Sequence, residues 1–248
     1  MKKILTVILI LAMAPINLFA SKNNITIGGG TGIGTSPYKG IDYDQFFVPY
    51  FDITYNDFYL RGVEIGYNVY QEDAFTLSLF ANPLGGYKVD ASDLSSGYNN
   101  IDDRDYQIEG GVKVVYDTSW YDLKLGGFAS LGEEGGSLGA FAFKSYFLTD
   151  RFSIIPKVYI KYLSEEYTDY YFGVTQAEAD RNSGINNSYN PDPTYTFGID
   201  LGAEYIVTEH LSLVGFFGLE KLSDEINNSP IVEEEILYKM GIGAKYTF

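Results

Sequence analysis

The sequence predicts an all-β fold: a transmembrane antiparallel up-and-down β-barrel of about twelve strands, with ten strands as the alternative. Three observations support this prediction. Apolar and polar residues alternate along most of the chain, aromatic residues and glycine are abundant, and the first residues resemble an export signal. The chain has 23 Tyr, 17 Phe and 27 Gly among 248 residues, against a single Trp. Outer-membrane barrels carry aromatic girdles at both membrane interfaces, and their strands alternate between lipid and lumen.

Residues 1–20 are expected to form a signal peptide, which leaves residues 21–248 as one barrel domain. Lys2 and Lys3 give a positive start, and the apolar segment 4–14 that follows is about eleven residues long. A membrane-spanning helix needs roughly twenty. Ala20 is a small residue suited to the position before cleavage. The alternative, an uncleaved anchor, is disfavoured by this short apolar segment, so we expect export to the cell outer membrane.

The last segment of the chain shows the alternation most clearly, because residues two apart share one face of a strand. One face is apolar: Ile236, Tyr238, Met240, Ile242, Ala244, Tyr246 and Phe248. The other face is small or charged: Lys239, Gly241, Gly243, Lys245 and Thr247. Segments 195–207, 106–116 and 121–130 repeat the pattern. In a soluble sandwich such apolar faces pack together, whereas in a membrane barrel they meet lipid. The terminal Phe248 favours the barrel, since it resembles the signal that barrel-assembly machinery reads.

Turn residues predict the topology. Short connections are expected at 71–73, 117–119, 149–151 and 208–210, and longer ones at 34–45, 90–104, 174–193 and 225–233. Outer-membrane barrels have short periplasmic turns and long outer loops, and single-chain bacterial barrels have even strand numbers. About eleven segments can be recognised. We therefore expect the missing strand near the hairpin at Asn56-Asp57 and Arg61.

Charge and cysteine content exclude some functions. The formal net charge of −16 argues against nucleic acid as a partner, and the absence of Cys excludes disulfides and thiolate metal sites. Charged residues of both signs are expected on lumen faces: Glu109, Lys113, Asp122, Lys124, Lys157, Lys161, Asp200, Glu204, Lys239 and Lys245. In a barrel of about twelve strands these charges are expected to pair and partly close the lumen, since open porins have sixteen or more strands. A selective pore lining is the alternative.

The sequence predicts no catalytic, cofactor-binding or metal site. The glycine-rich segment 27–34 does not fit G-x-G-x-x-G and is expected to be a strand. His210 is the only histidine, and it is expected in a periplasmic turn. A catalytic histidine needs a second group within hydrogen-bond reach. Asp102, Asp103 and Asp105 lack the spacing of a calcium loop, so a solvated loop is favoured over a weak calcium site.

One long outer loop is expected to be ordered. A strand end over residues 167–173 is expected to lead into helical residues 175–181, with Thr175 as N-cap and Glu178 three residues on. This loop resembles the tyrosine-rich "YYGV…A…RSG" motif of the MipA/OmpV family of outer-membrane proteins. Segment 222–232 resembles that family's last-loop "LSDE…DSPMV" pattern, and segments 36–39, 48–50 and 58–62 are similar in order and spacing. Phe172 and Asn182 are extra residues relative to the first motif.

The resemblance implies a barrel without known catalysis. Members are described as scaffolds that join a lytic transglycosylase, a murein hydrolase, to a penicillin-binding synthase, and others have permeability or adhesion roles. Outer-membrane lipid would surround the barrel. The motif residues form possible interaction loops: Tyr170, Tyr171, Gly173, Val174, Ala177, Arg181, Ser183, Gly184, Ser223, Asp224, Ser229, Pro230 and Val232. A non-enzymatic scaffold is therefore the expected function, and a small channel or adhesion protein is the alternative.

Overall fold

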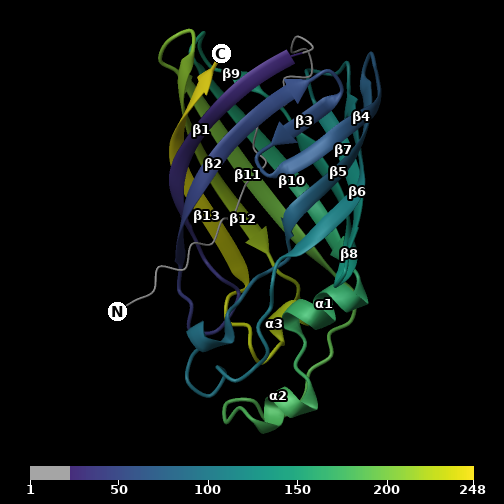
Figure 1. The fold of residues 1–248 in the computed structure, drawn as a ribbon, viewed down its shortest axis with the longest axis vertical. Coiled ribbons are helices and arrows are strands. Elements are labelled where there is room, and N and C mark those ends of the chain that lie inside the picture. Colours follow the sequence, from purple (N-terminus) through teal and green to yellow (C-terminus); the bar gives the residue numbers. More distant parts are fainter. Residues whose placement is uncertain (1–22) are drawn as a thin grey trace.

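The computed structural model describes residues 23–248, which form a closed antiparallel β-barrel (Figure 1). The predicted signal peptide lies outside the described residues. The strands are β1 (Asn23–Gly34), β2 (Asp44–Tyr55), β3 (Phe58–Arg61), β4 (Glu64–Glu72), β5 (Phe75–Gly85), β6 (Gln107–Asp117), β7 (Lys124–Gly132), β8 (Gly135–Phe143), β9 (Tyr146–Phe147), β10 (Phe152–Leu163), β11 (Thr194–Ile206), β12 (Leu211–Lys221) and β13 (Ile236–Thr247). The helices are η1 (Ala91–Asp93), α1 (Glu165–Phe172), α2 (Gln176–Asp180) and α3 (Asp224–Asn227). None of these helices is long and apolar enough to span a membrane.

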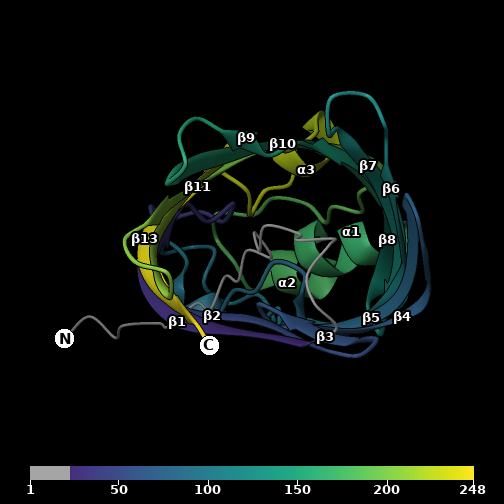
Figure 2. The same cartoon turned by 90° about the horizontal axis from the view of Figure 1, so that it is seen from above.

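The barrel has twelve strands, as the sequence predicts. Both β8 and β9 pair with the same edge of β10, so they are two parts of one interrupted strand. The wall closes where β13 pairs with β1, from Thr26 opposite Thr247 to Gly34 opposite Lys239. Seen along its axis, the sheet forms one ring in which each strand lies beside the next one in the chain, with β8 and β9 together counted as one strand (Figure 2).

The expected extra strand is β3, and it is only four residues long. Asn56 has a φ of 54° at the turn between β2 and β3, and Gly62 has a φ of 59° where the chain turns back into β4. Arg61 pairs with Asp52, which is only three residues from the end of β2 at Tyr55. The β3–β4 hairpin therefore starts at the turn end of the barrel and ends well before the loop end.

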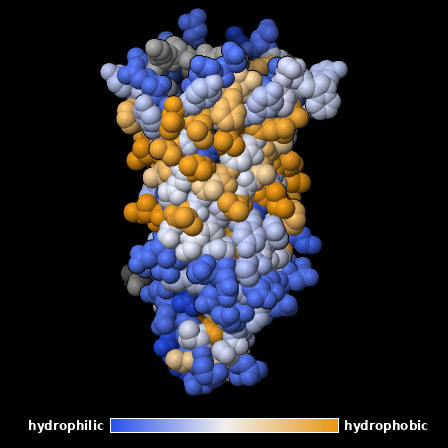
Figure 3. All heavy atoms as spheres, turned by 90° about the vertical axis from the view of Figure 1, so that its right-hand side faces the viewer, coloured by the Kyte–Doolittle hydropathy of each residue, from blue (hydrophilic) through white to orange (hydrophobic). Residues whose placement is uncertain are grey.

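The predicted faces are confirmed by burial. On β11, Thr196 and Asp200 point inward and are buried, while Ile199 and Leu201 point outward and are exposed. Outward apolar side chains gather in a belt around the middle of the molecule, with polar residues at both ends (Figure 3). A belt of this kind is what a lipid bilayer requires of a barrel.

The two ends of the barrel differ. The predicted short turns all lie at one end, and the long loops with the helices lie at the other (Figure 1). By the general rule for such barrels, the turn end faces the periplasm and the loop end faces the exterior. One strand boundary was predicted wrongly. Tyr121 and Asp122 have φ values of 54° and 57°, so they belong to a turn and β7 begins at Lys124. Asp122 is exposed and is not a lumen residue.

A charge placed on the apolar belt tests the lipid face. We expect Leu201→Arg, near the middle of β11, to lower the free energy of unfolding by about 2–4 kcal/mol, since that is the usual cost of a cation at the bilayer midplane. Val207→Arg, just beyond the end of β11, should cost at most about 1 kcal/mol. Denaturant unfolding in phospholipid vesicles measures both values. Equal costs at the two positions would contradict the membrane placement.

Candidate functional site

The outer loops fold into a cap over the barrel mouth. It comprises residues 35–43, 86–106, 164–193 and 222–235. The sequence predicted a strand end over residues 167–173, and this was wrong. Strand β10 ends at Leu163, and the hydroxyl of Ser164 accepts a hydrogen bond from the backbone N–H of Tyr167, which starts helix α1. The predicted helix over 175–181 is confirmed as α2, with both hydrogen bonds of a capping box between Thr175 and Glu178.

The cap has a hydrophobic core of its own, drawn from all four loops. Tyr38, Tyr171, Phe172, Ile226 and Ile231 are each at most 1% exposed. The ring of Tyr87 packs against Phe172 and Tyr171, with centroids 5.0 and 6.1 Å apart. Such aromatic pairs are worth about 0.5–1.5 kcal/mol each beyond the area they bury. Seen along the barrel axis, α1 and α2 lie across the far end of the lumen (Figure 2).

Tyr38 joins three loops. Its hydroxyl lies 2.8 Å from the carbonyl oxygen of Tyr87 and 3.0 Å from that of Tyr171. The hydroxyl is the hydrogen-bond donor, and its one proton is shared between these two acceptors. The ring stacks against Phe172 with centroids 6.2 Å apart. Burial raises the pKa of Tyr38 well above its ordinary value, so the hydroxyl stays protonated and keeps donating.

A buried ion pair joins α2 to the loop between β5 and β6. The Arg104 guanidinium lies 2.9 Å from Glu178 and also donates to the carbonyl of Gly173 at 3.2 Å. Glu178 accepts further hydrogen bonds from the backbone N–H groups of Asp102 and Thr175, at 2.9 and 2.8 Å. Burial raises the pKa of Glu178, but these N–H groups and Arg104 outweigh it and hold the pKa below its ordinary value.

The structure places the predicted motif residues within the cap, where several of them are structural. Tyr171, Gly173, Val174, Ser229 and Val232 are buried. The hydroxyl of Ser229 donates to the carbonyl of Phe172 at 2.6 Å, which connects the two motif loops. Arg181 pairs with Asp102 at the surface. The other motif residues are partly or fully exposed: Tyr170, Ala177, Ser183, Gly184, Ser223, Asp224 and Pro230. Whether they contact a partner stays a prediction.

The lumen charges pair across strands, as expected. Lys245 lies 2.7 Å from Glu204 and Lys113 lies 2.5 Å from Glu64. The remaining pairs are Arg61 with Asp52, Lys161 with Glu220, Lys124 with Asp117, and both Lys157 and Lys239 with Asp200. The sequence did not identify five of these partners, which are Asp52, Arg61, Glu64, Asp117 and Glu220. Glu109 has no ion-pair partner among the described residues, and it accepts hydrogen bonds from Ser130 and Gln107.

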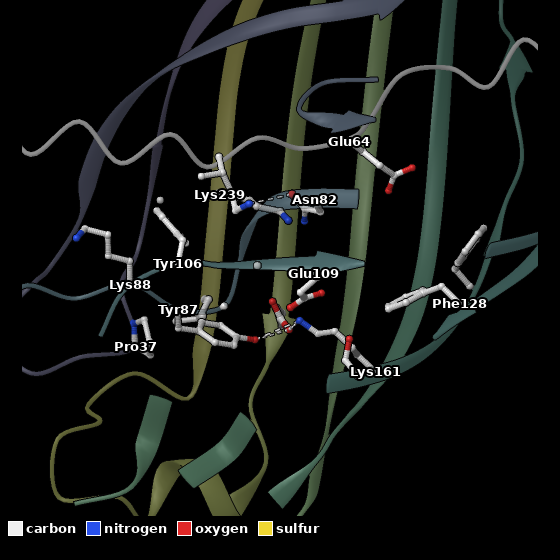
Figure 4. Close-up of a pocket in the computed structure, with 18 of the residues that line it drawn as sticks. Pro37, Glu64, Asn82, Tyr87, Lys88, Tyr106, Glu109, Phe128, Lys161 and Lys239 are labelled. Carbon is white, nitrogen blue, oxygen red and sulfur yellow. Dashed lines mark hydrogen bonds and ion pairs between the residues drawn. The ribbon is translucent and has the colours of Figure 1, made fainter. Parts of the chain in front are cut away.

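Beneath the cap the lumen contains a cavity of about 460 Å³. Its roof is a polar cluster in which Glu220 accepts hydrogen bonds from Tyr87 and Thr196, at 3.0 and 2.7 Å, and lies 3.1 Å from Lys161 (Figure 4). Its lining includes an aromatic wall of Phe80, Phe128 and Phe141, and also Lys157 and Lys239, with the Lys157 ammonium 5.5 Å from the ring centre of Phe141. A cavity of this size with a few convergent polar groups suits a small ligand.

The other candidates named from the sequence take part in hydrogen bonds and ion pairs within the protein. The ring of His210 lies in the turn between β11 and β12, where its Nδ1 is 2.9 Å from the carbonyl oxygen of Thr247. Asp102 pairs with Arg181, Asp103 accepts from the Ala91 N–H, and Asp105 pairs with Lys88. In the part of the chain that the structure describes, no group of three or more His, Asp or Glu side chains is placed to hold a metal ion.

Fold and site together define a capped outer-membrane β-barrel. The chain belongs to the family described as "MltA-interacting protein MipA", which matches residues 27–248. It is 31% identical to the "24 kDa outer membrane protein" of Pasteurella multocida (strain Pm70), over 94% of each chain. It is 25% identical to the "MltA-interacting protein" of Escherichia coli (strain K12), over 92% of each chain. The chain is therefore an outer-membrane protein.

Removing the charge of Glu178 tests the cap. We expect Glu178→Gln to loosen segments 98–104 and 174–184, because Arg104 would keep a buried charge without a counter-charge, a change that typically costs about 3–5 kcal/mol. Hydrogen exchange in these segments should accelerate, while exchange in β11 and β12 stays slow. The surface variant Asp180→Asn is the matched control. Unchanged exchange in Glu178→Gln would contradict a structural role for the pair.

The same residue predicts a pH dependence. The pKa of Glu178 in the folded cap is below its ordinary value of 4.5, so its stabilisation is complete above that value. It is lost as the pH falls through the lower folded value. Proteolysis of the cap should therefore increase below about pH 4 in the native protein. In Glu178→Gln this acid-dependent increase should be smaller.

Proposed function

We propose that this protein is a non-enzymatic scaffold that holds a murein hydrolase, and with it a penicillin-binding synthase, at the outer membrane. Outer-membrane lipid surrounds its apolar belt. The observation that carries the proposal is an apolar patch at the turn end, made of Trp120, Tyr121, Tyr146, Phe147 and Leu148, which we call the turn patch. Trp120 is 66% exposed and Phe147 is 82% exposed.

The turn patch is one surface built from two neighbouring turns. The ammonium of Lys144 lies 5.5 Å from the ring centre of Tyr121 and 4.6 Å from that of Tyr146. Contiguous exposed apolar groups of this kind mark interaction sites, and aromatic residues are enriched at the centre of protein interfaces. The patch lies at the end assigned to the periplasm, the side on which murein enzymes work. The printed name of the Escherichia coli relative also supports a partner of this class.

The cap has a different role in this proposal. It lies at the opposite end of the barrel from the turn patch, and it closes the mouth with buried side chains. Its motif residues then preserve a closed barrel, and the partner enzymes bind at the turns. Substitutions in the turn patch should therefore change partner binding, whereas substitutions in the cap should change closure of the barrel mouth.

A pull-down tests the turn patch. The variant Trp120→Ser/Phe147→Ser should recover at least about tenfold less murein hydrolase from cross-linked envelopes than the native protein, since interface aromatics commonly contribute 2 kcal/mol or more. Tyr195→Ser, an exposed aromatic at the loop end of β11, is the matched control and should retain the partner. Equal recovery from both variants would rule out the turn patch, and recovery of no murein enzyme by the native protein would rule out the scaffold.

The second candidate is a small channel, which the charged lumen and its cavity favour. The packed cap argues against steady conduction, because all four of its loops share one core. We expect planar-bilayer recordings of the native protein to show no stable open state. Loosening the cap with Glu178→Gln should produce intermittent openings. A large steady conductance from the native protein would support the channel instead.

A further inference from the structure

The barrel wall is incomplete on one side. The β3–β4 hairpin ends at Gly62, whose N–H donates to the carbonyl of Phe51 at 2.7 Å. Toward the loop end, β2 continues from Phe51 to Asp44 and pairs only with β1. Across from it, β5 continues past Ala81, its last partner to β4, and pairs only with β6. We call the space bordered by β2, the hairpin tip and β5 the side window (Figure 1).

The side window is wide. At the hairpin tip, β2 and β5 are separated by β3 and β4, which makes three inter-strand spacings. Neighbouring strands lie about 4.8 Å apart, so the two edges begin about 14 Å apart. In residues 23–248 no further strand pairs with either edge between the hairpin tip and the loop end.

Both edges carry a proline. The carbonyl of Phe51 points to the window side, and backbone groups alternate sides along a strand, so the nitrogen of Pro49 points into the window as well. On the other edge Pro83 lies at an irregularity of β5, where the Asn82 side chain accepts from the Leu84 N–H at 3.1 Å. Proline cannot donate to a ladder and is confined to strand edges and bulges. Pro49 therefore cannot donate a hydrogen bond to a strand across the window, and Pro83 lies where the pairing of β5 with β6 is irregular.

The side window lies at the height of the apolar belt. Phe47, on the outer face of β2 beside the window, is 59% exposed, and Ile108 on nearby β6 is 71% exposed. An open sheet edge cannot face hydrocarbon alone, because its backbone groups would lack hydrogen-bond partners. Irregular backbone at membrane depth is tolerated where it lines a polar cavity. The cavity beneath the cap meets this requirement, and Asp44 of β2 and Asn82 and Leu84 of β5 all line it.

We propose that the side window admits a single-chain anionic amphiphile from the membrane into the cavity. The head group would bind between Lys157 and Lys239. Their ammonium groups lie 3.8 and 3.6 Å from the one carboxylate of Asp200, so two cations share a single anion at more than hydrogen-bond distance. The alkyl chain would lie against Phe80, Phe128 and Phe141, which line the aromatic wall, and leave toward lipid between the window edges.

A quenching experiment tests this proposal. The single Trp120 is replaced, and Trp120→Phe/Leu84→Trp places the only indole beside the window. The full mature barrel is placed in phosphatidylcholine nanodiscs and titrated with a bromine-labelled fatty acid. We expect saturable quenching. Lys157→Met/Lys239→Met should weaken it at least about tenfold, the factor expected when hydrogen bonds to charged groups are lost. The control Lys245→Met/Glu204→Gln removes a lumen pair near the turn end and should leave it unchanged.

Two further measurements complete the test. The chain has no Cys, so Phe47→Cys/Pro83→Cys can be bridged specifically across the window by a bifunctional maleimide. Bridging should slow entry of the fatty acid, whereas the same reagent on each single-Cys protein should not. Absence of saturable quenching would overturn the proposal. Equal binding of a quaternary ammonium with the same chain, or unchanged binding by the double-lysine variant, would overturn the head-group site. The proposal is independent of the scaffold, since no residue that lines the cavity belongs to the turn patch.

Discussion

The absence of water in the hydrocarbon core is the constraint on which this structure depends. Every strand must satisfy its backbone groups with neighbouring strands, so the sheet has to close. Closure is made by β1 and β13, the first and last strands, in a register that pairs Thr26 with Thr247. Outward side chains can then be apolar, and inward charges such as Lys113 and Glu64 can pair in a protected lumen. The side window interrupts this wall, and a polar cavity lies behind it.

Beyond the membrane the same backbone is free to be irregular, and the chain uses this freedom to build the cap. The cap resembles a small soluble domain in its physics, with a core of fully buried aromatic and aliphatic side chains. It also contains a buried ion pair, Arg104 with Glu178, which is stable because backbone N–H groups complete the coordination of the carboxylate. Lipid packing supports the barrel, whereas burial and hydrogen bonding support the cap.

Local patterns were sufficient to predict much of this fold. Alternation identified β6, β11 and β13 and their lipid faces, because a two-residue period is visible within one strand. The capping box of α2 was also visible, since Thr175 and Glu178 are three residues apart. Helix α1 was missed because Tyr167, Tyr170, Tyr171 and Phe172 suggested a strand. The signal available was Ser164 as N-cap with Glu165 and Glu166 in the first turn.

Other features depend on register, which a single sequence does not contain. Glu64 and Glu220 face Lys113 and Lys161 only once distant strands are aligned. The incomplete wall has local traces in Pro49 and Pro83, but the gap itself results from the length of the β3–β4 hairpin relative to β2 and β5.

The contacts that hold the cap together join residues far apart in sequence, and this bears on the order in which the protein folds. Tyr38 binds carbonyls that are 49 and 133 residues away in sequence, and Ser229 binds one that is 57 residues away. Bringing residues so far apart in sequence into contact costs much conformational entropy while the chain between them is unstructured. The cost is smaller once the strands between them are paired. We therefore expect the cap to form after the final strand has joined the first. An antibody that recognises the assembled cap would distinguish fully inserted barrels from chains still in transit through the envelope.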